Sequence, residues 1–177
     1  MASRPAQAEK AYSFENLHGV DGRSYSLSSF DDKQILVVIF SGNGCPTAKA
    51  TEPRIMEIQR DYAEKGVQIV LINSNNSSIS PPDTFTEMVK RAREKGYNFP
   101  YLKDEGREAA RSFGAMNTPH AFVLDRERRL RYKGRVDNAR EASRVTVNDL
   151  RNALDDVLAG GEVRNEENDP FGCSIVW

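Results

Sequence analysis

The chain has 177 residues, which is enough for one domain with a buried core. Apolar residues make up 38% and charged residues 29%, a balance typical of a soluble globular protein. The formal net charge of −1 gives no electrostatic basis for binding nucleic acid or an anionic membrane, and the longest apolar run, residues 35–40, is far too short to span a bilayer.

Residues 1–10 read as a flexible lead-in, because they are polar and lack the apolar stretch of a secretory signal. Without such a signal, and with only two cysteines in the chain, we expect a reducing compartment, the cytoplasm. One domain is expected over residues 11–160, since no linker-like stretch interrupts it. Residues 161–177 form a polar and acidic tail.

The first half of the domain reads as a strand–helix–strand unit. A hairpin is predicted around the turn at residues 19–22, which is flanked by the aromatic residues Tyr12, Phe14 and Tyr25. The β-branched run over 34–40 predicts a strand buried on both faces. A helix over 46–65, kinked at Pro53, and a second buried strand over 67–73 complete the unit, which is expected to be parallel and right-handed.

The second half alternates helices and strands after a polar loop over residues 74–82. Apolar spacing predicts helices over residues 83–95, 105–113 and 145–158 and apolar strands over 99–102, 119–124 and 130–136. The last of these strands is expected to be an edge strand, because it pairs back after a charged turn. The alternation predicts an α/β domain.

Cys45 is the residue with the clearest chemical role. It follows the turn at residues 41–44 and opens the helix that begins at Pro46. A thiol at a helix N-terminus meets unpaired backbone N–H groups and the positive end of the helix dipole, which favour the reactive thiolate. Lys49, one turn further, is expected to add positive charge. The alternative is an inert buried thiol, because free cysteines are often buried.

Three motifs in register resemble the thioredoxin fold. Residues 40–49 match its strand, turn, nucleophilic cysteine and following lysine, with Cys45 at the first cysteine of the CxxC motif. Pro53 takes the place of its helix-kinking proline. The segment Asn117-Thr118-Pro119, followed by an apolar strand, resembles the cis-proline loop that faces the active cysteine. The resemblance implies a thioredoxin-like mixed β-sheet flanked by helices, with an N-terminal β-hairpin.

Within that superfamily the chain most resembles the peroxiredoxin-like, redoxin (AhpC/TSA-type) branch. The Cys-Pro step at residue 45, the segments 73–75 and 99–104, and the terminal Gly-Cys-Ser-Ile-x-Trp carry this resemblance. It implies a thiol-dependent oxidoreductase that needs no metal or organic cofactor. In that reaction the Cys45 thiolate attacks a disulfide or a peroxide, and Cys173 or an external thiol resolves the product.

The same resemblance assigns roles to the residues around Cys45. Pro46 pre-sets the helix start, and Lys49 adds a positive field. Thr47, Thr118 and Pro119 shape the substrate site, with Thr118–Pro119 expected in the cis form. The backbone of Thr118 would offer a strand-like edge to a bound peptide.

Departures from the family pattern bear on the reaction. Ala48 stands at the second CxxC position, so no vicinal disulfide can form. Ile39 replaces the buried acid of thioredoxins. Peroxiredoxins carry a threonine three residues before the peroxidatic cysteine and a proline seven before it, but here these positions are Gly42 and Val38. The missing hydroxyl argues against a peroxidase.

Cys173 is either a loosely held tail residue or a resolving thiol. The tail from Gly160 to Cys173 spans up to roughly 40 Å when extended, enough to reach Cys45 in its own chain or in a neighbour. A disulfide also needs Cα atoms within about 7 Å. The apolar side chains around Cys173 predict that the tail docks on an apolar surface: Phe171, Ile175 and Trp177.

The histidines do not predict a metal site. His120 with Cys45 is similar to a copper-binding pair in relatives of this fold, but those need a second cysteine where Lys49 stands. The basic run over residues 126–129 is interrupted by Glu127 and lacks interleaved aromatics, so it reads as a solvated turn and not as a nucleic-acid site.

The favoured function is therefore a thiol-dependent oxidoreductase of the peroxiredoxin-like group. Its expected partners are a disulfide or peroxide substrate and an external thiol reductant, with no nucleic acid and no membrane, and a homodimer is compatible with the sequence. Two alternatives stay open. One is a strict thiol peroxidase with an antioxidant role, and the other is a non-catalytic binding module that uses the cis-proline edge.

Overall fold

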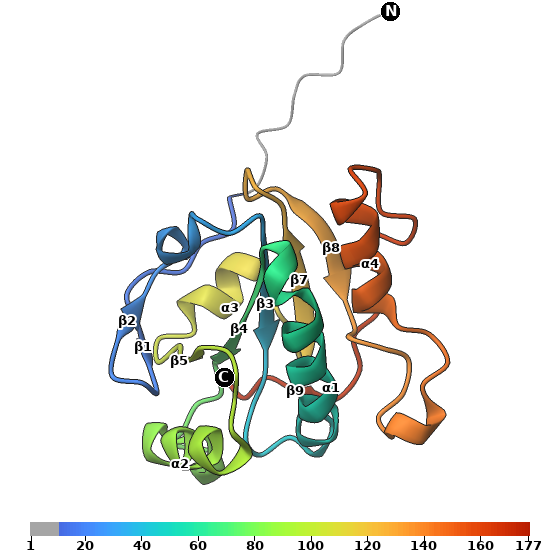
Figure 1. Cartoon of the computed structure of the whole chain (residues 1–177). Helices are drawn as coiled ribbons and strands as arrows, with labels where there is room; N and C mark the ends of the chain where they lie inside the picture. Colours follow the sequence, from blue (N-terminus) through green and yellow to red (C-terminus); the bar gives the residue numbers. More distant parts are fainter. Residues whose placement is uncertain (1–10) are drawn as a thin grey trace, which may run out of the picture.

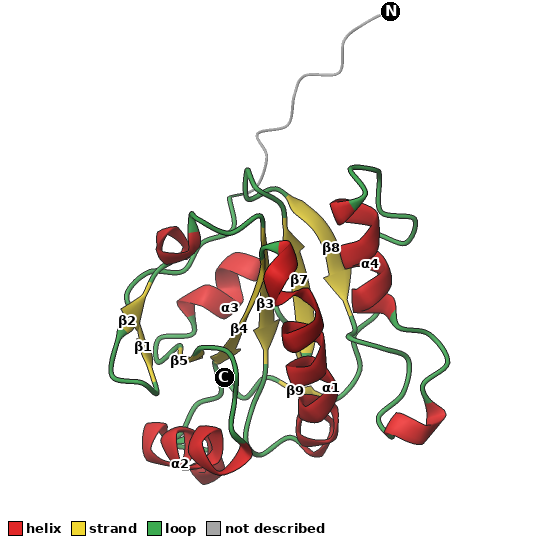
Figure 2. Cartoon of the chain, viewed as in Figure 1, coloured by secondary structure: helices red, strands yellow, loops and turns green. Residues whose placement is uncertain are grey.

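The computed structural model describes residues 11–177, so the predicted flexible lead-in lies outside the described residues. A seven-stranded mixed sheet forms the centre of this part of the chain (Figures 1 and 2). From one edge to the other, its strands are β2 (Ser24–Tyr25), β1 (Leu17–Gly19), β5 (Tyr101–Lys103), β4 (Val67–Asn73), β3 (Ile35–Phe40), β7 (His120–Leu124) and β8 (Leu130–Gly134).

Strand β3 is central because its side chains are apolar on both faces and every one of them is buried. It pairs in parallel with β4 and antiparallel with β7. Its odd-numbered residues, Ile35 to Ile39, belong to one apolar cluster, and its even-numbered residues, Leu36 to Phe40, belong to the other. This alternation follows from the two-residue period of a strand and places a core on each face of the sheet.

Four α-helices cover the two faces: α1 (Pro46–Tyr62), α2 (Phe85–Lys95), α3 (Glu108–Phe113) and α4 (Asp149–Leu158). Ile55 of α1, Met88 of α2 and Leu150 of α4 belong to the first cluster, and Phe113 of α3 belongs to the second. The helices α1, α2 and α4 therefore pack against one face, and α3 packs against the other. The predicted thioredoxin-like α/β fold with helices on both faces is confirmed.

The predicted hairpin is also confirmed, although its strands are short and lie after Tyr12 and Phe14. Three predicted helices begin too early. Thr84 has extended backbone angles after a short 3-10 turn over Pro81–Asp83, and its hydroxyl accepts the N–H of Glu87, so α2 begins at Phe85. Arg107 adopts a left-handed conformation immediately before α3. Asn138 holds the chain extended before α4 by accepting from the backbone N–H groups of residues 146 and 147.

The tail over residues 161–177 packs against the domain. Strand β9 (Cys173–Ser174) pairs antiparallel with β6 (Asn117–Thr118), directly before Pro119. Further back, the N–H of Lys133 donates to Glu166, and the N–H of Asn168 donates to Lys133. In Figure 1 this segment runs past the end of the sheet from which α1 starts. Within residues 11–177 no helix has both the length and the apolar character needed to cross a membrane.

Candidate active site around Cys45

Cys45 lies between the end of the central strand and the start of the first long helix. β3 ends at Phe40, and the turn over residues 41–44 leads to Cys45, which is the N-cap of α1 with extended backbone angles, φ −91° and ψ 114°. Pro46 takes the first helical position, where its missing N–H is not needed. The predicted placement of Cys45 at a helix N-terminus is thus confirmed, and its side chain is 2% exposed.

The sulfur of Cys45 has partners in both of its protonation states. As a thiol it donates to the carbonyl oxygen of Thr118 at 3.1 Å. As an acceptor it receives the backbone N–H of Ala48 at 3.3 Å. Burial raises the pKa of Cys45, but hydrogen bonds from the side chain of Thr118, from Ala48 and from Cys173 outweigh it, so the pKa lies below that of an ordinary thiol. The site therefore favours a thiolate at residue 45.

Thr118, the residue before Pro119, lies directly against this sulfur. The Thr118–Pro119 peptide bond is cis, as predicted, and Thr118 is 1% exposed. The loop brings the carbonyl of Thr118 to the thiol and leaves the backbone of β6 as a short strand edge. That edge was expected to be open to a substrate chain. It is occupied by β9 of the same chain, so this expectation needs correction: the edge is accessible to a peptide only if the tail moves.

Cys173 is the residue that β9 places opposite Thr118. It is half-buried, whereas Cys45 is enclosed. Burial raises the pKa of Cys173 to about 11, helped by the hydrogen bond that its thiol gives to Cys45 and by the negative charge there. The pKa values of the two thiols therefore shift in opposite directions, that of Cys45 downward and that of Cys173 upward. The structure contains both as free cysteines.

Backbone contacts hold the segment 172–177 in place. The N–H of Ile175 donates to the carbonyl of Met116 at 3.0 Å, and the N–H of Val176 donates to Oδ1 of Asn75 at 2.9 Å. The backbone N–H of Asn76 donates to the carbonyl of Val176 at 2.7 Å. Ile175 is 4% exposed and joins the apolar cluster under α3, which confirms that the tail docks on an apolar surface.

Gly172 is required where the tail approaches Thr118. Its φ of 133° lies in the region that favours glycine, and a Cβ at this position would overlap the carbonyl oxygen of Thr118. The same Cβ would lie 3.4 Å from Cβ of Thr47, so Thr47 lines the other side of the approach. Thr47 is buried, and with Thr118 it encloses the turn that precedes Cys173.

Asp83 is a site residue that sequence reasoning missed. Its side chain is fully buried and accepts hydrogen bonds from the N–H of Asn43 at 2.6 Å and from the hydroxyl of Ser80 at 2.6 Å. The amides of Asn73 and Asn75 also donate to it, at 2.9 and 3.1 Å. Asp83 therefore joins the loop before Cys45 to Asn75, the residue that holds Val176.

The sequence offered little to reveal this network. Asp83 reads as part of the helix that follows it, and Asn43 and Asn75 read as turn residues. The only signal was the number of polar residues in the loops that follow the two buried strands, each before the next helix. Since buried polar groups must be paired, such a cluster of asparagines near a carboxylate indicates a network once the strands are placed side by side.

The structure does not bring Lys49 to the thiol. Its backbone N–H donates to the carbonyl of Cys45 at 3.0 Å, but its exposed side chain lines a separate groove with Met56 and Arg91. In the structure the groups that stabilise a thiolate at residue 45 are therefore the hydrogen-bond donors around it. Pro46 is exposed beside the site, and its contribution is confined to the start of the helix.

His120 belongs to the core of the domain. It is 3% exposed, packs on the ring of Phe122 and accepts the N–H of Met116 on Nδ1 at 3.3 Å. Burial lowers its pKa to about 4, with Lys133 adding to the effect, so the ring is neutral near pH 7. Among residues 11–177 no group of three or more His, Cys, Asp or Glu side chains could hold a metal ion.

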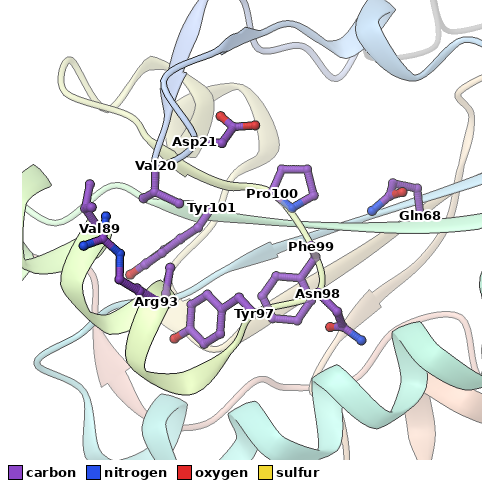
Figure 3. Close-up of a pocket in the computed structure, with 11 residues that line it drawn as sticks. Val20, Asp21, Gln68, Val89, Arg93, Tyr97, Asn98, Phe99, Pro100 and Tyr101 are labelled. Atoms are coloured by element: carbon purple, nitrogen blue, oxygen red, sulfur yellow. The ribbon is translucent and has the colours of Figure 1, made fainter.

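An open pocket lies away from Cys45. It has a volume of about 470 Å³ and is lined by the N-terminal hairpin, α2 and the segment before β5 (Figure 3). Tyr97, Phe99 and Tyr101 form its aromatic side, with Asp21 and Arg93 at the rim. No residue that contacts Cys45 lines it, so it is not the approach to the thiol.

A comparison with protein families decides the relationship that the motifs suggested. The model of the Redoxin family matches residues 6–154. The chain belongs to the redoxin family. Among solved structures, this redoxin is similar to a hypothetical protein of Sinorhizobium meliloti 1021, with 36% identity, coverage of 99% of this chain and 96% of the other, and a TM-score of 0.88. It is also similar to an uncharacterised protein of Geobacillus kaustophilus, with 35% identity, coverage of 96% of this chain and 90% of the other, and a TM-score of 0.88.

More distant relatives carry names. The thiol-disulfide oxidoreductase ResA of Bacillus thuringiensis subsp. konkukian is 23% identical over 108 residues, which is 61% of this redoxin and 58% of ResA. The match thus spans less than two thirds of that relative. A thiol:disulfide interchange protein of the thioredoxin family from Chlorobium tepidum TLS is 23% identical, with coverage of 73% of this chain and 87% of the other and a TM-score of 0.59. This likeness supports the fold.

Proposed function

We propose that this redoxin is a thiol–disulfide oxidoreductase whose redox pair is Cys45 and Cys173 of the same chain. The observation that carries the proposal is the pairing of β9 with β6, which places Cys173 opposite Thr118, the residue whose carbonyl lies 3.1 Å from the Cys45 sulfur. The missing CxxC cysteine at Ala48 is thereby replaced by a cysteine far along the sequence. The name of the ResA relative supports disulfide chemistry in the same family.

In the proposed cycle the Cys45 thiolate attacks one sulfur of a substrate disulfide. A mixed disulfide forms between Cys45 and that sulfur, and the second substrate sulfur leaves as a thiolate that takes a proton from solvent. Cys173 loses its proton and attacks Sγ of Cys45, which breaks the mixed disulfide and releases the first substrate sulfur. An external thiol then reduces the Cys45–Cys173 disulfide, so the substrate gains two electrons from that reductant.

The pKa difference between the two thiols sets the order of these steps. In the reduced protein Cys173 keeps its proton because of burial and because Cys45 carries the charge beside it. Once Cys45 is bonded to a substrate sulfur, that charge is gone and the pKa of Cys173 falls. The resolving thiol therefore becomes nucleophilic only after the first step.

The surroundings of Gly42 favour a disulfide over a peroxide as substrate. A Cβ at residue 42 would lie 2.5 Å from Nδ2 of Asn75 and 3.3 Å from Oδ1 of Asp83. The space in which peroxiredoxins place their hydroxyl is therefore filled by the network around Asp83. The second candidate is an antioxidant role by peroxide reduction, which membership of the redoxin family supports. The peroxide assay described below tests this candidate.

The decisive experiment uses the full chain, Cys45→Ser and Cys173→Ser. On incubation with one equivalent of a small aromatic disulfide, the unaltered chain should release two thiols and yield a Cys45–Cys173 peptide in a non-reducing map. Cys173→Ser should release one thiol and keep the other half bound to Cys45, and Cys45→Ser should stay unreacted at this site. Equal thiol release by the unaltered chain and Cys173→Ser, with no such peptide, would overturn the assigned pair.

The rate at which hydrogen peroxide is lost in the presence of dithiothreitol distinguishes a peroxidase from a thiol–disulfide oxidoreductase. We expect no rate above that of Cys45→Ser. The alkylation rate of Cys45 distinguishes the oxidoreductase from a non-catalytic binding module. If the protein is only a binding module, Cys45 should react no faster than a free thiol at neutral pH.

We also propose that the protein works as a single chain in the cytoplasm. The segment between the anchor at Asn168 and Cys173 is about 17 Å long when extended, so Cys173 stays close to its own Cys45 and needs no second chain. A reducing compartment would keep both cysteines free until substrate arrives. Trapping the thiols in intact cells should then show mainly reduced Cys45.

A further inference from the structure

The groove that holds the C-terminal tail recognises mainly backbone atoms. The carbonyl of Met116, Oδ1 of Asn75 and the backbone N–H of Asn76 each bond a main-chain group of residues 175 or 176. Side chains of this groove also reach main-chain oxygens: Nδ2 of Asn117 donates to Gly172 at 3.4 Å, Oγ1 of Thr118 to Cys173 at 3.5 Å, and Nδ2 of Asn76 to Trp177 at 3.4 Å. An extended peptide with glycine at the position of Gly172 could form these bonds.

Side-chain selection is confined to alternate positions of the tail. Cys173 lies opposite Thr118, and Ile175 enters the apolar cluster beneath α3, whereas Ser174 between them is exposed. This follows from the two-residue period of an extended chain, in which residues i and i+2 share a face. The groove therefore selects a glycine, the cysteine that follows it and, two residues after the cysteine, an aliphatic side chain.

The tail is attached in a way that lets this segment leave. It is anchored upstream by the backbone bonds of Lys133 with Glu166 and Asn168. Beyond this anchor, the segment 172–177 buries one apolar side chain, Ile175. A segment with so few buried groups can detach while β8, β6 and the sheet stay intact.

We propose that this groove is a polypeptide-binding site for extended segments that carry a glycine, then a cysteine, and an aliphatic residue two positions after the cysteine, and that residues 172–177 are its built-in competitor. The inference rests on the proposed function and names its substrate class, a disulfide in an extended stretch of another protein. A substrate segment replaces the tail strand for strand and brings its sulfur to the Cys45 thiolate. After the mixed disulfide has formed, the tail returns, and attack by Cys173 breaks the bond to the substrate and expels it.

The competition has a quantitative consequence. The apparent affinity for an outside peptide is its intrinsic affinity multiplied by the fraction of chains whose groove is vacant. Weakening the tail raises that fraction. Ile175→Ala removes the buried side chain and keeps every backbone bond, whereas Val176→Ala changes a half-buried side chain that does not enter the apolar cluster.

The test measures binding of a fluorescent, thiol-free peptide, Gly-Ser-Ser-Ile-Val-Phe, to full-length reduced protein by anisotropy. Ile175→Ala should bind it about tenfold or more tightly than the unaltered chain, and Val176→Ala should stay within about twofold. A peptide with aspartate in place of isoleucine should bind at least about tenfold more weakly. Equal affinities for the three proteins, or for the two peptides, would overturn the proposal.

A second readout needs no substitution. The chain has one tryptophan, Trp177, whose ring lies 5.5 Å from the guanidinium carbon of Arg111. The unlabelled peptide has none, so saturating it should shift Trp177 emission towards that of a solvated indole as the tail leaves. Binding without such a shift would place the peptide elsewhere and contradict the competition. Because the peptide carries no thiol, these outcomes do not depend on whether the Cys45–Cys173 disulfide forms.

Discussion

At the scale of single residues, the reactivity of Cys45 depends on a balance between burial and hydrogen bonding. Burial in the enclosed site opposes ionisation, and the carbonyl of Thr118 accepts only from the protonated thiol. The side chain of Thr118 and the N–H of Ala48 act in the other direction and prevail. Since a distant lysine contributes less than a direct hydrogen bond, the neighbours of the sulfur determine its charge.

Replacing Thr118 by valine should raise the pKa of Cys45, because one hydrogen bond to the thiolate is lost at constant volume. The pH midpoint of iodoacetamide alkylation then moves upward, towards the free-thiol value of about 8.5. In the unaltered chain the midpoint should lie below that value. Thr51→Val is the control, since its hydroxyl bonds the carbonyl of Thr47 within α1. An unchanged midpoint in Thr118→Val would contradict the assignment.

At the scale of elements, the site is built from three segments far apart in sequence: the start of α1, the loop before β7 and the tail strand β9. The tail is the weakest of them. Complete burial of an aliphatic side chain such as Ile175 contributes about 1.5–3 kcal/mol, and β9 is two residues long. The docked tail can therefore shield Cys45 and still open without unfolding of the domain.

Gly172→Ala should release the tail, because its Cβ would overlap the carbonyl of Thr118. We expect Cys45 to be alkylated faster by bulky maleimides at a fixed pH, by about tenfold, as enclosure by β9 is lost. Gly161→Ala is the matched control, since the nearest atom to its Cβ is the carbonyl of Asp156 at 3.9 Å. Equal alkylation rates in the two variants would show that the tail does not enclose the thiol.

Asp83→Asn tests the network beneath the site. The amide presents donors to groups that are themselves donors, the N–H of Asn43 and the amides of Asn73 and Asn75, so buried polar groups lose their partners. We expect the free energy of unfolding, measured by urea titration, to fall by about 2–4 kcal/mol. Asp32→Asn, at an exposed position, should change it by less than about 0.5 kcal/mol. A loss no larger than the control would mean that the network does not stabilise the site.

At the scale of the whole molecule, the two apolar clusters make the sheet and its helices one cooperative unit, and His120 is the titratable ring at its centre. Because its pKa is about 4 when folded and near 6.5 when exposed, the unfolded chain binds more protons between these values. Its contribution to stability is complete above about pH 6.5 and is lost as the pH falls towards 4.

His120→Gln should therefore flatten the pH dependence of stability. Between pH 7 and pH 4 the unaltered chain should lose up to roughly 3 kcal/mol more unfolding free energy than this variant does, as followed by urea titration at each pH. All other titrating groups are common to the two proteins, so the difference isolates His120. Parallel pH profiles would show that the ring does not titrate on unfolding.

The succession of the main strands and helices, the burial of β3 on both faces and the cis form of Thr118–Pro119 could be predicted from the sequence. These features depend on local patterns: a continuous β-branched run, turn residues and a family motif. Helix starts were less accurate, since Thr84, Arg107 and Asn138 act through caps and loop contacts that propensity does not reveal. The position of the Lys49 side chain, in a separate groove with Met56 and Arg91, could not be predicted because spacing along a helix does not fix the direction of a long side chain.

The sequence by itself determined that a cysteine opens the first long helix, that its vicinal partner is absent, and that a second cysteine lies near the end of the chain. Only the tertiary structure decided that Cys173 lies opposite Thr118 and that the tail fills the edge expected for a substrate. It also decided that the buried Asp83 joins the loop before Cys45 to the residue that holds the tail. The reason is physical: local propensities act over a few residues, whereas strand register and buried hydrogen bonds join segments 55 residues apart, as between Thr118 and Cys173.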